Sequence, residues 1–410
     1  MIDGKAHQQL SVYIHWPFCL SKCPYCGFAS RPMAAAMEHN PSIVDDVAAY
    51  LLLDLKRELE LLEQQSQNQP GIMIPASGLL LKSIFFGGGT PSLMAAKFVE
   101  NIVNFLCKKY SVDSSLEISM EANPATFTLR NLWDFRCAGI NRMSLGIQSF
   151  SDIGLQFLGR IYTAQQALSA TELIAKIFTN FSCDFIYGYA QQTSGDLEKD
   201  LSTAINFGCK HISCYQLTYE DGTVFFEKLL SGDLRPMDEK NEVQLYDFIG
   251  NYLQTKEIFR YEISNYAKPS CECIHNMNYW RYGDYLGIGP GAHSRLTIAG
   301  RKNEIVKIED PQDWCDSLRR GNDARAHTAI LSEREELEEM MLMGLRLEEG
   351  IGLKAFELRG LQRHIDGILK SDRMQFLMRR RLMQEHPQKL QLTANGRKKL
   401  DSVVKFLLVE

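Results

Sequence analysis

The first half of the chain alternates between short strand-forming runs and longer segments with apolar residues at helical spacing. Six such runs lie at 11–14, 82–86, 116–120, 142–147, 183–186 and 211–216. Between them, the apolar spacing predicts helices that include 44–62 and 98–106. This alternation makes parallel strands with right-handed crossovers the simplest topology. We therefore expect an α/β fold, either an incomplete parallel barrel or an open doubly wound sheet, with its site at the carboxyl ends of the strands.

The pattern changes along the rest of the chain. Segment 65–78 is rich in Pro, Gly and polar residues and predicts a surface loop, and 256–296 is rich in Tyr, Gly and Asn. Ser332 and Glu335 fit a capping box at the start of a further helical region. We expect a core domain at 1–232, an accessory α+β extension at 233–327 and a small helical or winged-helix domain at 328–410.

Charge and hydropathy exclude some classes of protein. The net charge of −5 gives no sign of the clustered positive charge that nucleic acid requires. No apolar stretch approaches the length of a membrane span, and the N-terminus lacks the apolar core of a secretory signal, so a cytoplasmic protein is expected. The odd total of eleven cysteines argues against a disulfide framework. Six are expected to be small buried apolar side chains: Cys107, Cys137, Cys183, Cys209, Cys214 and Cys315.

Three further cysteines form a tight group directly after the first predicted strand. Cys19, Cys23 and Cys26 have the spacing C-x3-C-x2-C. Three thiolates can hold three irons of a [4Fe–4S] cubane and leave the fourth iron open, where S-adenosylmethionine can bind. The alternatives are a zinc site, for which His15 is the nearby fourth ligand, or three structural cysteines.

The residues around this group carry a resemblance to a known superfamily. Tyr25 is an aromatic residue before the last cysteine, and a GGGTP segment at 87–91 follows the second predicted strand. Both features resemble the radical-SAM superfamily, so the resemblance implies a [4Fe–4S] cluster, S-adenosylmethionine and an incomplete (β/α)6 barrel. It also implies that Tyr25 lies beside the adenine and that the glycine-rich segment holds the methionyl amino group.

A finer resemblance, to the oxygen-independent coproporphyrinogen III oxidase branch, covers almost the whole chain. It rests on segments such as IHWPFCLSKCPYCGFAS, EISMEANP, GINRMSLGIQSF and HNMNYWRYGDYLGIGPGAHS. Chemically, Glu121 and Asp184 can accept hydrogen bonds from an amino group or ribose hydroxyls, and Arg160 can pair with a carboxylate. The resemblance implies contacts with S-adenosylmethionine by Tyr13, Gly88, Gly89, Thr90, Glu121, Gln148, Arg160 and Asp184.

The chain departs from the pattern of this branch at a few positions. Gly27 stands where Asp is common, and Tyr189 and Ala190 replace a usual Leu-Pro. Tyr162 stands where His often follows the Gly-Arg pair. Chemistry that used such a His as a proton donor is therefore in doubt here.

The branch contains two kinds of protein, a porphyrin-forming dehydrogenase and the HemW heme chaperones. The dehydrogenase has a fourth cysteine where this chain has Phe28, and a long N-terminal extension where this chain has 18 residues before Cys19. A HN-x-x-YW motif at 275–280 is typical of HemW-like proteins. His275 is a candidate axial ligand for heme iron, with Cys271 and Cys273 as thiolate alternatives. The alternative to heme ligation is that His275 is packed and hydrogen-bonded and has only a structural role.

We therefore expect a heme chaperone that delivers heme to hemoproteins of respiration. The alternative is the oxygen-independent coproporphyrinogen III dehydrogenase, an oxidative decarboxylase of porphyrin biosynthesis. A radical-SAM enzyme for an unrelated substrate and a structural iron–sulfur or zinc protein remain as other classes. A flavodoxin or ferredoxin electron donor is implied if S-adenosylmethionine is cleaved, and a homodimer is a further candidate assembly.

Overall fold

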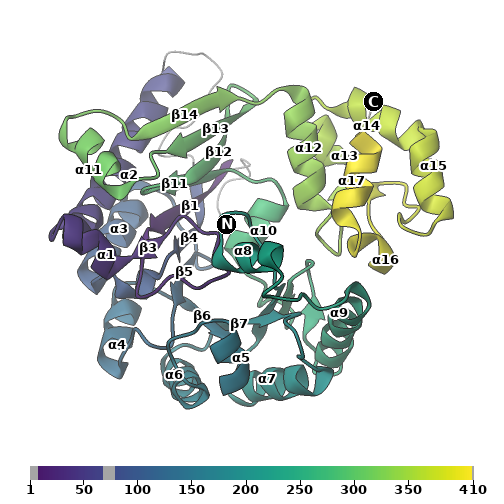
Figure 1. The fold of residues 1–410 in the computed structure, drawn as a ribbon. Helices are drawn as coiled ribbons and strands as arrows, with labels where there is room; N and C mark the ends of the chain where they lie inside the picture. The colour runs from purple at the N-terminus through teal and green to yellow at the C-terminus, as the bar shows by residue number, and fades with distance from the viewer. Residues whose placement is uncertain (1–7, 68–78, 409–410) are drawn as a thin grey trace.

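One mixed sheet of twelve strands forms the centre of the protein in the computed structural model, which describes residues 8–67 and 79–408 (Figure 1). Its middle consists of parallel neighbours in chain order, each joined to the next by helical crossovers. Each of the six predicted runs falls on one of them, which confirms the parallel core. These strands are β1 (Gln8–Trp16), β4 (Leu79–Gly88), β5 (Glu117–Ala122), β6 (Arg142–Gln148), β7 (Phe181–Tyr187) and β8 (His211–Gln216).

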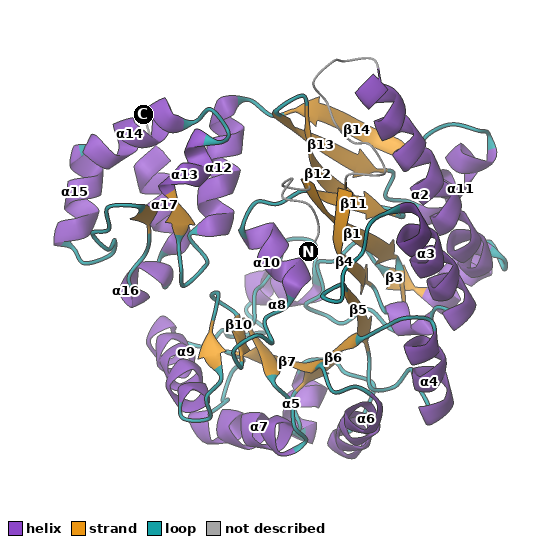
Figure 2. Cartoon of the chain, turned by 180° about the vertical axis from the view of Figure 1, so that it is seen from behind, coloured by secondary structure: helices purple, strands orange, loops and turns teal. Residues whose placement is uncertain are grey.

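Helices cover the outer face of this curved sheet, as Figure 2 shows. Alternate strand residues such as Val12, Ile84 and Met120 are completely buried in one large apolar core. Apolar burial of this kind is the main favourable term in folding. The covering helices are α2 (Ile43–Gln67), α3 (Ala96–Lys109), α4 (Leu129–Cys137), α6 (Ala164–Ile177), α7 (Ser194–Asn206) and α9 (Glu239–Gln254).

The other set of alternate residues lines the concave inner face. Because successive side chains of a strand point to opposite faces, the inward positions form a separate series. Small hydroxyl side chains recur in it, buried among larger polar and aromatic residues. They are Ser11, Ser83, Ser119, Ser182 and Ser213. The interior of the barrel is thus polar and leaves room for groups other than apolar side chains.

The sheet continues beyond the parallel core at both edges. β11 (Tyr285–Ile288) pairs parallel to β1, and β12 (His293–Ile298), β13 (Arg301–Lys307) and β14 (Arg325–Ile330) follow antiparallel. At the opposite edge lie β10 (Asn265–Ala267) and β9 (Phe259–Arg260). The accessory region therefore extends the core sheet, and α11 (Pro311–Arg319) packs against α2. The boundary predicted at 327/328 lies within β14, and the domain limits stay predictions.

A second apolar core belongs to the C-terminal region, which lies beside the barrel in Figure 1. Leu337, Met341, Phe356 and Val404 are among its buried members. Ser332 and Glu335 form the predicted capping box. The elements are α12 (Glu333–Gly344), β15 (Ile351–Gly352), α13 (Leu353–Glu357), α14 (Gln362–Lys370), α15 (Asp372–Arg379), β16 (Lys389–Leu390), α16 (Ala394–Arg397) and α17 (Leu400–Leu408). This mostly helical unit confirms the fold predicted for the C-terminus.

Some expectations for single segments need correction. Cys137 is exposed and Cys107 is half-buried, whereas the other four of those cysteines are buried as predicted. Cys137 is two positions beyond the buried Phe135 of α4, so it lies on the opposite side of the helix. The predicted loop at 65–78 begins inside α2, and its remainder, 68–78, lies outside the described residues. Among the described helices, none is both long and apolar enough to cross a membrane.

A buried ion network fastens α2 to the edge strands. Lys307 is fully buried, and its Nζ lies 2.6 Å from both Asp54 Oδ1 and Glu58 Oε1. Arg325 adds a second cation, with its Nη2 2.7 Å from Glu58 Oε2. The Asp54 carboxylate also accepts from the Gly289 backbone N–H at 3.0 Å. Each buried charge therefore has an oppositely charged partner, which is the condition for its burial.

We predict that Lys307→Ala destabilises the protein strongly, by about 3–5 kcal/mol, because it leaves two buried carboxylates with one cation. Thermal and urea unfolding of the purified chain measures this. Lys176→Ala is the matched control, since Lys176 and Glu172 form an exposed pair and such pairs contribute about 0–1 kcal/mol. Equal effects of the two substitutions would contradict the assigned role of the network.

Candidate functional site

The three cysteines lie on one loop at the carboxyl end of β1. The loop begins with β2 (Phe18–Cys19), which pairs with β3 (Arg31–Pro32), ahead of α1 (Met33–His39). Cys19 is buried, whereas Cys23 and Cys26 are half-buried, and the Cys26 N–H donates to the Cys23 carbonyl at 3.0 Å. Burial raises the pKa of the Cys19 thiol, and the neighbouring Cys26 adds to this. A metal partner would favour the thiolate instead.

The geometry fits an iron–sulfur cluster better than a zinc ion. Among the described residues, no group of three or more His, Cys, Asp or Glu is placed to hold a single metal ion. A cubane differs because each of its cysteines binds a different iron. His15, the fourth ligand that zinc would need, is buried, with Nδ1 3.1 Å from the Tyr13 hydroxyl and Nε2 2.8 Å from the Ala29 carbonyl. Both ring nitrogens are therefore already engaged.

The glycine-rich segment lies directly against the cysteine loop. It joins β4 to the short helix η1 (Pro91–Leu93). The N–H of Gly89 donates to the Trp16 carbonyl at 2.7 Å, and the N–H of Thr90 donates to the Phe18 carbonyl at 2.8 Å. A Cβ on Gly89 would come 2.5 Å from the Phe18 oxygen, and Gly88 has a φ of +110°. Only glycine permits this close approach, which holds the two loops together.

Two carboxyl groups lie inside the barrel beside these loops. Glu121 accepts from the Gly88 N–H at 3.1 Å, and Asp184 accepts from the hydroxyls of Ser144 at 2.7 Å and Ser182 at 2.8 Å. Burial raises the pKa of Glu121 to about 8, and the nearby Asp184 contributes. Burial likewise raises the pKa of Asp184. A cationic amino group or ribose hydroxyls would find ready acceptors here.

Arg160 reaches the cysteine loop from the far side of the barrel mouth. Its Nη1 donates to Cys23 Sγ at 2.9 Å and to the Tyr25 hydroxyl at 3.2 Å. Its Nε donates to the Tyr162 hydroxyl at 3.0 Å, which in turn donates to the Gly146 carbonyl at 2.8 Å. Burial raises the pKa of Tyr162 to about 12, so it stays neutral. Tyr162, which stands where the branch often has His, thus positions the guanidinium of Arg160.

The remaining predicted cofactor residues lie at the same end of the barrel. Tyr13 stacks on Phe85 with ring centroids 6.2 Å apart, and burial raises its pKa with a contribution from Glu121. Gln148 ends β6 with a φ of 64°, and a Cβ built on Gly146 would lie 3.0 Å from its Nε2. The parallel strands therefore bring together residues that are far apart in the sequence. Their contacts with S-adenosylmethionine stay predictions.

Sequence reasoning missed the residues that support this site. The helix α8 (Val224–Ser231) holds the cysteine loop, since the Phe225 N–H donates to the Pro24 carbonyl at 2.9 Å and its ring lies 6.2 Å from that of Tyr25. No motif signals this contact. Ser144 and Ser182 could have been found, because a serine at alternate positions of an otherwise apolar strand marks a polar inner face.

The helix α10 (Ile274–Trp280) carries the HN-x-x-YW motif and packs against β4 inside the curve of the sheet (Figure 1). His275 is 1% exposed, with Nδ1 2.8 Å from Ser83 Oγ and Nε2 3.0 Å from the Tyr279 hydroxyl. It also stacks on Phe85. Burial lowers the pKa of His275 to about 3, so the ring is neutral. Heme ligation by His275 stays a prediction, and it would require iron to replace one of these hydrogen bonds.

The rest of the motif joins the barrel to the C-terminal region. The guanidinium of Arg346 lies 4.5 Å from the ring centroid of Trp280 and forms an ion pair with Glu262 at 3.1 Å. Burial, with the carboxylate of Glu117, raises the pKa of Cys273 to about 12. The Cys273 Sγ donates to Glu117 Oε1 at 3.3 Å, and ligation of heme iron by Cys273 stays a prediction.

Comparison with known proteins agrees with the fold and the site. The model of the radical SAM superfamily matches residues 13–204, and that of the HemN C-terminal domain matches 331–398. The structure of coproporphyrinogen III oxidase (HemN) from Escherichia coli has a TM-score of 0.74 at 18% identity, over 98% of this chain and 90% of that one. The fold and the cysteine loop therefore define a protein of the radical SAM superfamily.

Relatives with curated names identify the family within this superfamily. The heme chaperone HemW of Haemophilus influenzae is 33% identical over 410 residues, which cover 98% of this chain and 98% of the relative. That of Escherichia coli strain K12 is 37% identical over 310 residues, which cover 74% of this chain and 75% of the relative. The chain belongs to the HemW family.

We predict that Glu121→Gln raises the thermal midpoint of the cofactor-free protein, relative to wild type, more at about pH 9 than at about pH 5. Between its ordinary pKa and the folded value of about 8, Glu121 is ionised when unfolded and protonated when folded, so wild-type stability falls as the pH rises. Glutamine has no such linkage. Glu172→Gln, at an exposed pair, is the control. A difference from wild type that is flat or shrinks with pH would contradict the prediction.

Proposed function

We propose that this protein is a heme chaperone that binds heme, a [4Fe–4S] cluster and S-adenosylmethionine and transfers heme to hemoproteins of respiration. The observation that carries the proposal is similarity over almost the whole chain to a protein named as a heme chaperone. The loop of Cys19, Cys23 and Cys26, together with the glycine-rich segment that lies on it, supports the cofactors.

The residues of the barrel mouth have separable roles in this proposal. Cys19, Cys23 and Cys26 hold the cluster, and Gly88, Gly89, Thr90 and the acceptors Glu121 and Asp184 hold S-adenosylmethionine. When bound, the reduced cluster with S-adenosylmethionine supplies one-electron chemistry. Arg160 contributes a fixed positive charge beside Cys23. The burial of Cys19 keeps water from one side of the loop.

The chaperone is favoured over the decarboxylating enzyme by the residue after the cluster loop. Phe28 stands where the dehydrogenase has its fourth cysteine, and its side chain is 69% exposed. A phenyl ring offers neither a thiol for radical or acid chemistry nor a metal ligand. The likeness to the HemN structure extends to the fold alone.

The remaining parts of the proposal rest on the sequence. The recipients are respiratory hemoproteins, a flavodoxin or ferredoxin supplies electrons where S-adenosylmethionine is cleaved, and the protein acts in the cytoplasm. A homodimer is the proposed assembly. Gel filtration of the reconstituted protein with and without heme tests whether it is a homodimer.

We predict that the protein, reconstituted anaerobically with iron and sulfide, binds heme with a saturable Soret shift and does not decarboxylate coproporphyrinogen III. Both are measured in one set of samples with S-adenosylmethionine and reductant. Formation of protoporphyrinogen would overturn the chaperone proposal in favour of the dehydrogenase. Cofactor cleavage without any affinity for porphyrin would instead indicate a radical-SAM enzyme for another substrate.

We predict that Cys19→Ala, Cys23→Ala and Cys26→Ala each abolish the bound iron, the acid-labile sulfide and the cluster absorption, because each removes a thiolate that nothing else on the loop replaces. Cys137→Ala is the matched control, since Cys137 is exposed on α4 and distant in the sequence from the loop. Stoichiometric zinc without sulfide in the wild type would contradict the cluster.

A further inference from the structure

A cavity of about 1080 Å³ lies at the amino-terminal end of the barrel, opposite the cysteine loop. Gln9 near the start of β1 and Ser115 ahead of β5 place it at that end. Its lining carries charges of both signs, among them Glu272, Arg281 and Glu349. A polar space of this size admits water. The cavity can therefore exchange protons between water and groups that reach it from the interior of the barrel.

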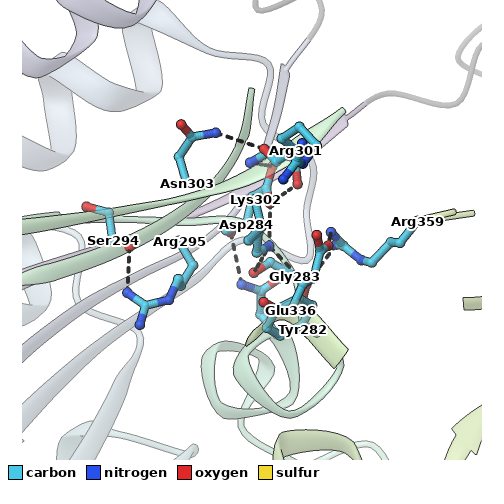
Figure 3. Close-up of polar contacts among 12 residues, drawn as sticks. Tyr282, Gly283, Asp284, Ser294, Arg295, Arg301, Lys302, Asn303, Glu336 and Arg359 are labelled. Atoms are coloured by element: carbon cyan, nitrogen blue, oxygen red, sulfur yellow. Dashed lines mark hydrogen bonds and ion pairs between the residues drawn. The ribbon is translucent and has the colours of Figure 1, made fainter. Parts of the chain in front are cut away.

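The wall of this cavity beside the C-terminal region is fixed by buried charges (Figure 3). The fully buried ammonium of Lys302 lies 2.7 Å from Asp284 Oδ1 and donates to the Tyr282 carbonyl at 3.2 Å. Arg359 donates to Glu336 Oε1 at 2.9 Å and to the same carbonyl at 3.1 Å. Asp284 and Arg359 themselves belong to the lining, so this network keeps the cavity open.

Tyr261 connects the cavity with the interior of the barrel. It belongs to the lining, and its backbone carbonyl accepts from the Glu348 N–H at 3.0 Å. Its hydroxyl lies 2.8 Å from Nε2 of His211, the first residue of β8. The Nδ1 of His211 lies 2.9 Å from Ser182 Oγ, which donates to Asp184 Oδ1 at 2.8 Å. These are hydrogen-bond distances, so one continuous chain runs from the cavity to the predicted cofactor site.

The donors of this chain all point one way when Asp184 is ionised. The carboxylate accepts the only hydroxyl proton of Ser182, so Ser182 accepts from the Nδ1–H of His211. The Nε2 of a neutral imidazole then accepts from the Tyr261 hydroxyl. Burial, with Arg142 nearby, lowers the pKa of His211 well below its ordinary value, so the ring is neutral as this order requires. Each link thus carries one proton and offers one acceptor, as a proton shuttle does.

The surroundings of Asp184 prepare it to lose a proton when a ligand binds. Burial raises its pKa, against the hydrogen bonds from three serine hydroxyls and the charge of Arg142. The other titratable groups that face it are Glu121, Cys183, Cys214 and Tyr215. A ligand that donates hydrogen bonds to Asp184 favours the ionised form, so its binding releases the proton. That ligand then stands between Asp184 and the water at the carboxyl end of the barrel.

We propose that Tyr261, His211 and Ser182 form a proton path through which Asp184 releases its proton to the cavity when S-adenosylmethionine binds. The inference rests on the proposed function and deepens it. Asp184 gives its proton to Ser182 Oγ, and the proton of Ser182 moves to His211 Nδ1. The proton on Nε2 moves to Tyr261, which gives its own to water. One proton leaves, each link keeps one, and no electron is transferred.

The test is stopped-flow mixing of the full-length, cluster-loaded protein with saturating S-adenosylmethionine, in weak buffer with a pH indicator and without reductant. Asp184→Asn identifies the part of the proton release that comes from Asp184. Tyr261→Phe should slow this part about 100-fold, within the range that positioned proton-transfer groups contribute, and leave the total unchanged. Tyr246→Phe is the matched control, since the Tyr246 hydroxyl has no hydrogen-bond partner among the described residues.

A second pair of variants breaks the path at its other end. Ser182→Ala should slow the same part of the proton release. Ser213→Ala should leave its rate unchanged, because the Ser213 hydroxyl also bonds to Asp184 but lies outside the chain. Cluster absorption and the thermal midpoint verify that each variant is folded and loaded.

The outcomes separate this inference from the proposed function. If equilibrium dialysis shows no binding of S-adenosylmethionine to the wild type, the cofactor in the proposed function is wrong, and the inference falls with it. If the cofactor binds and Asp184→Asn releases as many protons as the wild type, the inference alone is overturned. It is likewise overturned if Tyr261→Phe and Ser182→Ala release protons at the rates of their controls.

Discussion

A single buried carboxylate, Glu117 at the start of β5, joins the interior of the barrel to the helix that closes it. Its oxygens accept from the backbone N–H groups of Ile274 at 3.1 Å and His275 at 3.2 Å, and from Cys273 Sγ at 3.3 Å. A carboxylate at the start of a helix bonds the free N–H groups there and complements the helix dipole. Arg142 Nε, 4.0 Å away, balances the charge. The position of α10 at the base of the barrel therefore depends on Glu117 together with the hydrogen bond between His275 and Ser83.

The cofactor site depends on the parallel direction of the same strands. Parallel strands all end at one edge of the sheet, so residues from β1, β4, β5, β6 and β7 meet there although long helical crossovers separate them in the sequence. The small inward serines make this assembly possible, because they leave space and supply hydroxyl donors for Asp184. The outer face of each strand contributes the apolar burial that stabilises the barrel.

The sequence alone predicted the strands of the parallel core and the cysteine loop at their carboxyl ends, because strand periodicity and cysteine spacing are local signals. It did not predict the continuation of the sheet through β11 to β14, since the pairing of β11 with β1 joins residues far apart in the chain. Nor did it predict that Tyr162 and Phe225 position Arg160 and Tyr25, because these contacts exist only after folding. The cavity at the amino-terminal end of the barrel was missed for the same reason, as its lining comes from separate stretches of the sequence between Gln9 and Arg359.

The placement of α10 inside the curve of the sheet couples its motif to the carboxyl end of the barrel. The ring of His275 stacks on Phe85 with centroids 5.0 Å apart, and Tyr13 stacks on the same ring at 6.2 Å. A shift of α10 therefore displaces a stack of rings that ends at a predicted cofactor residue.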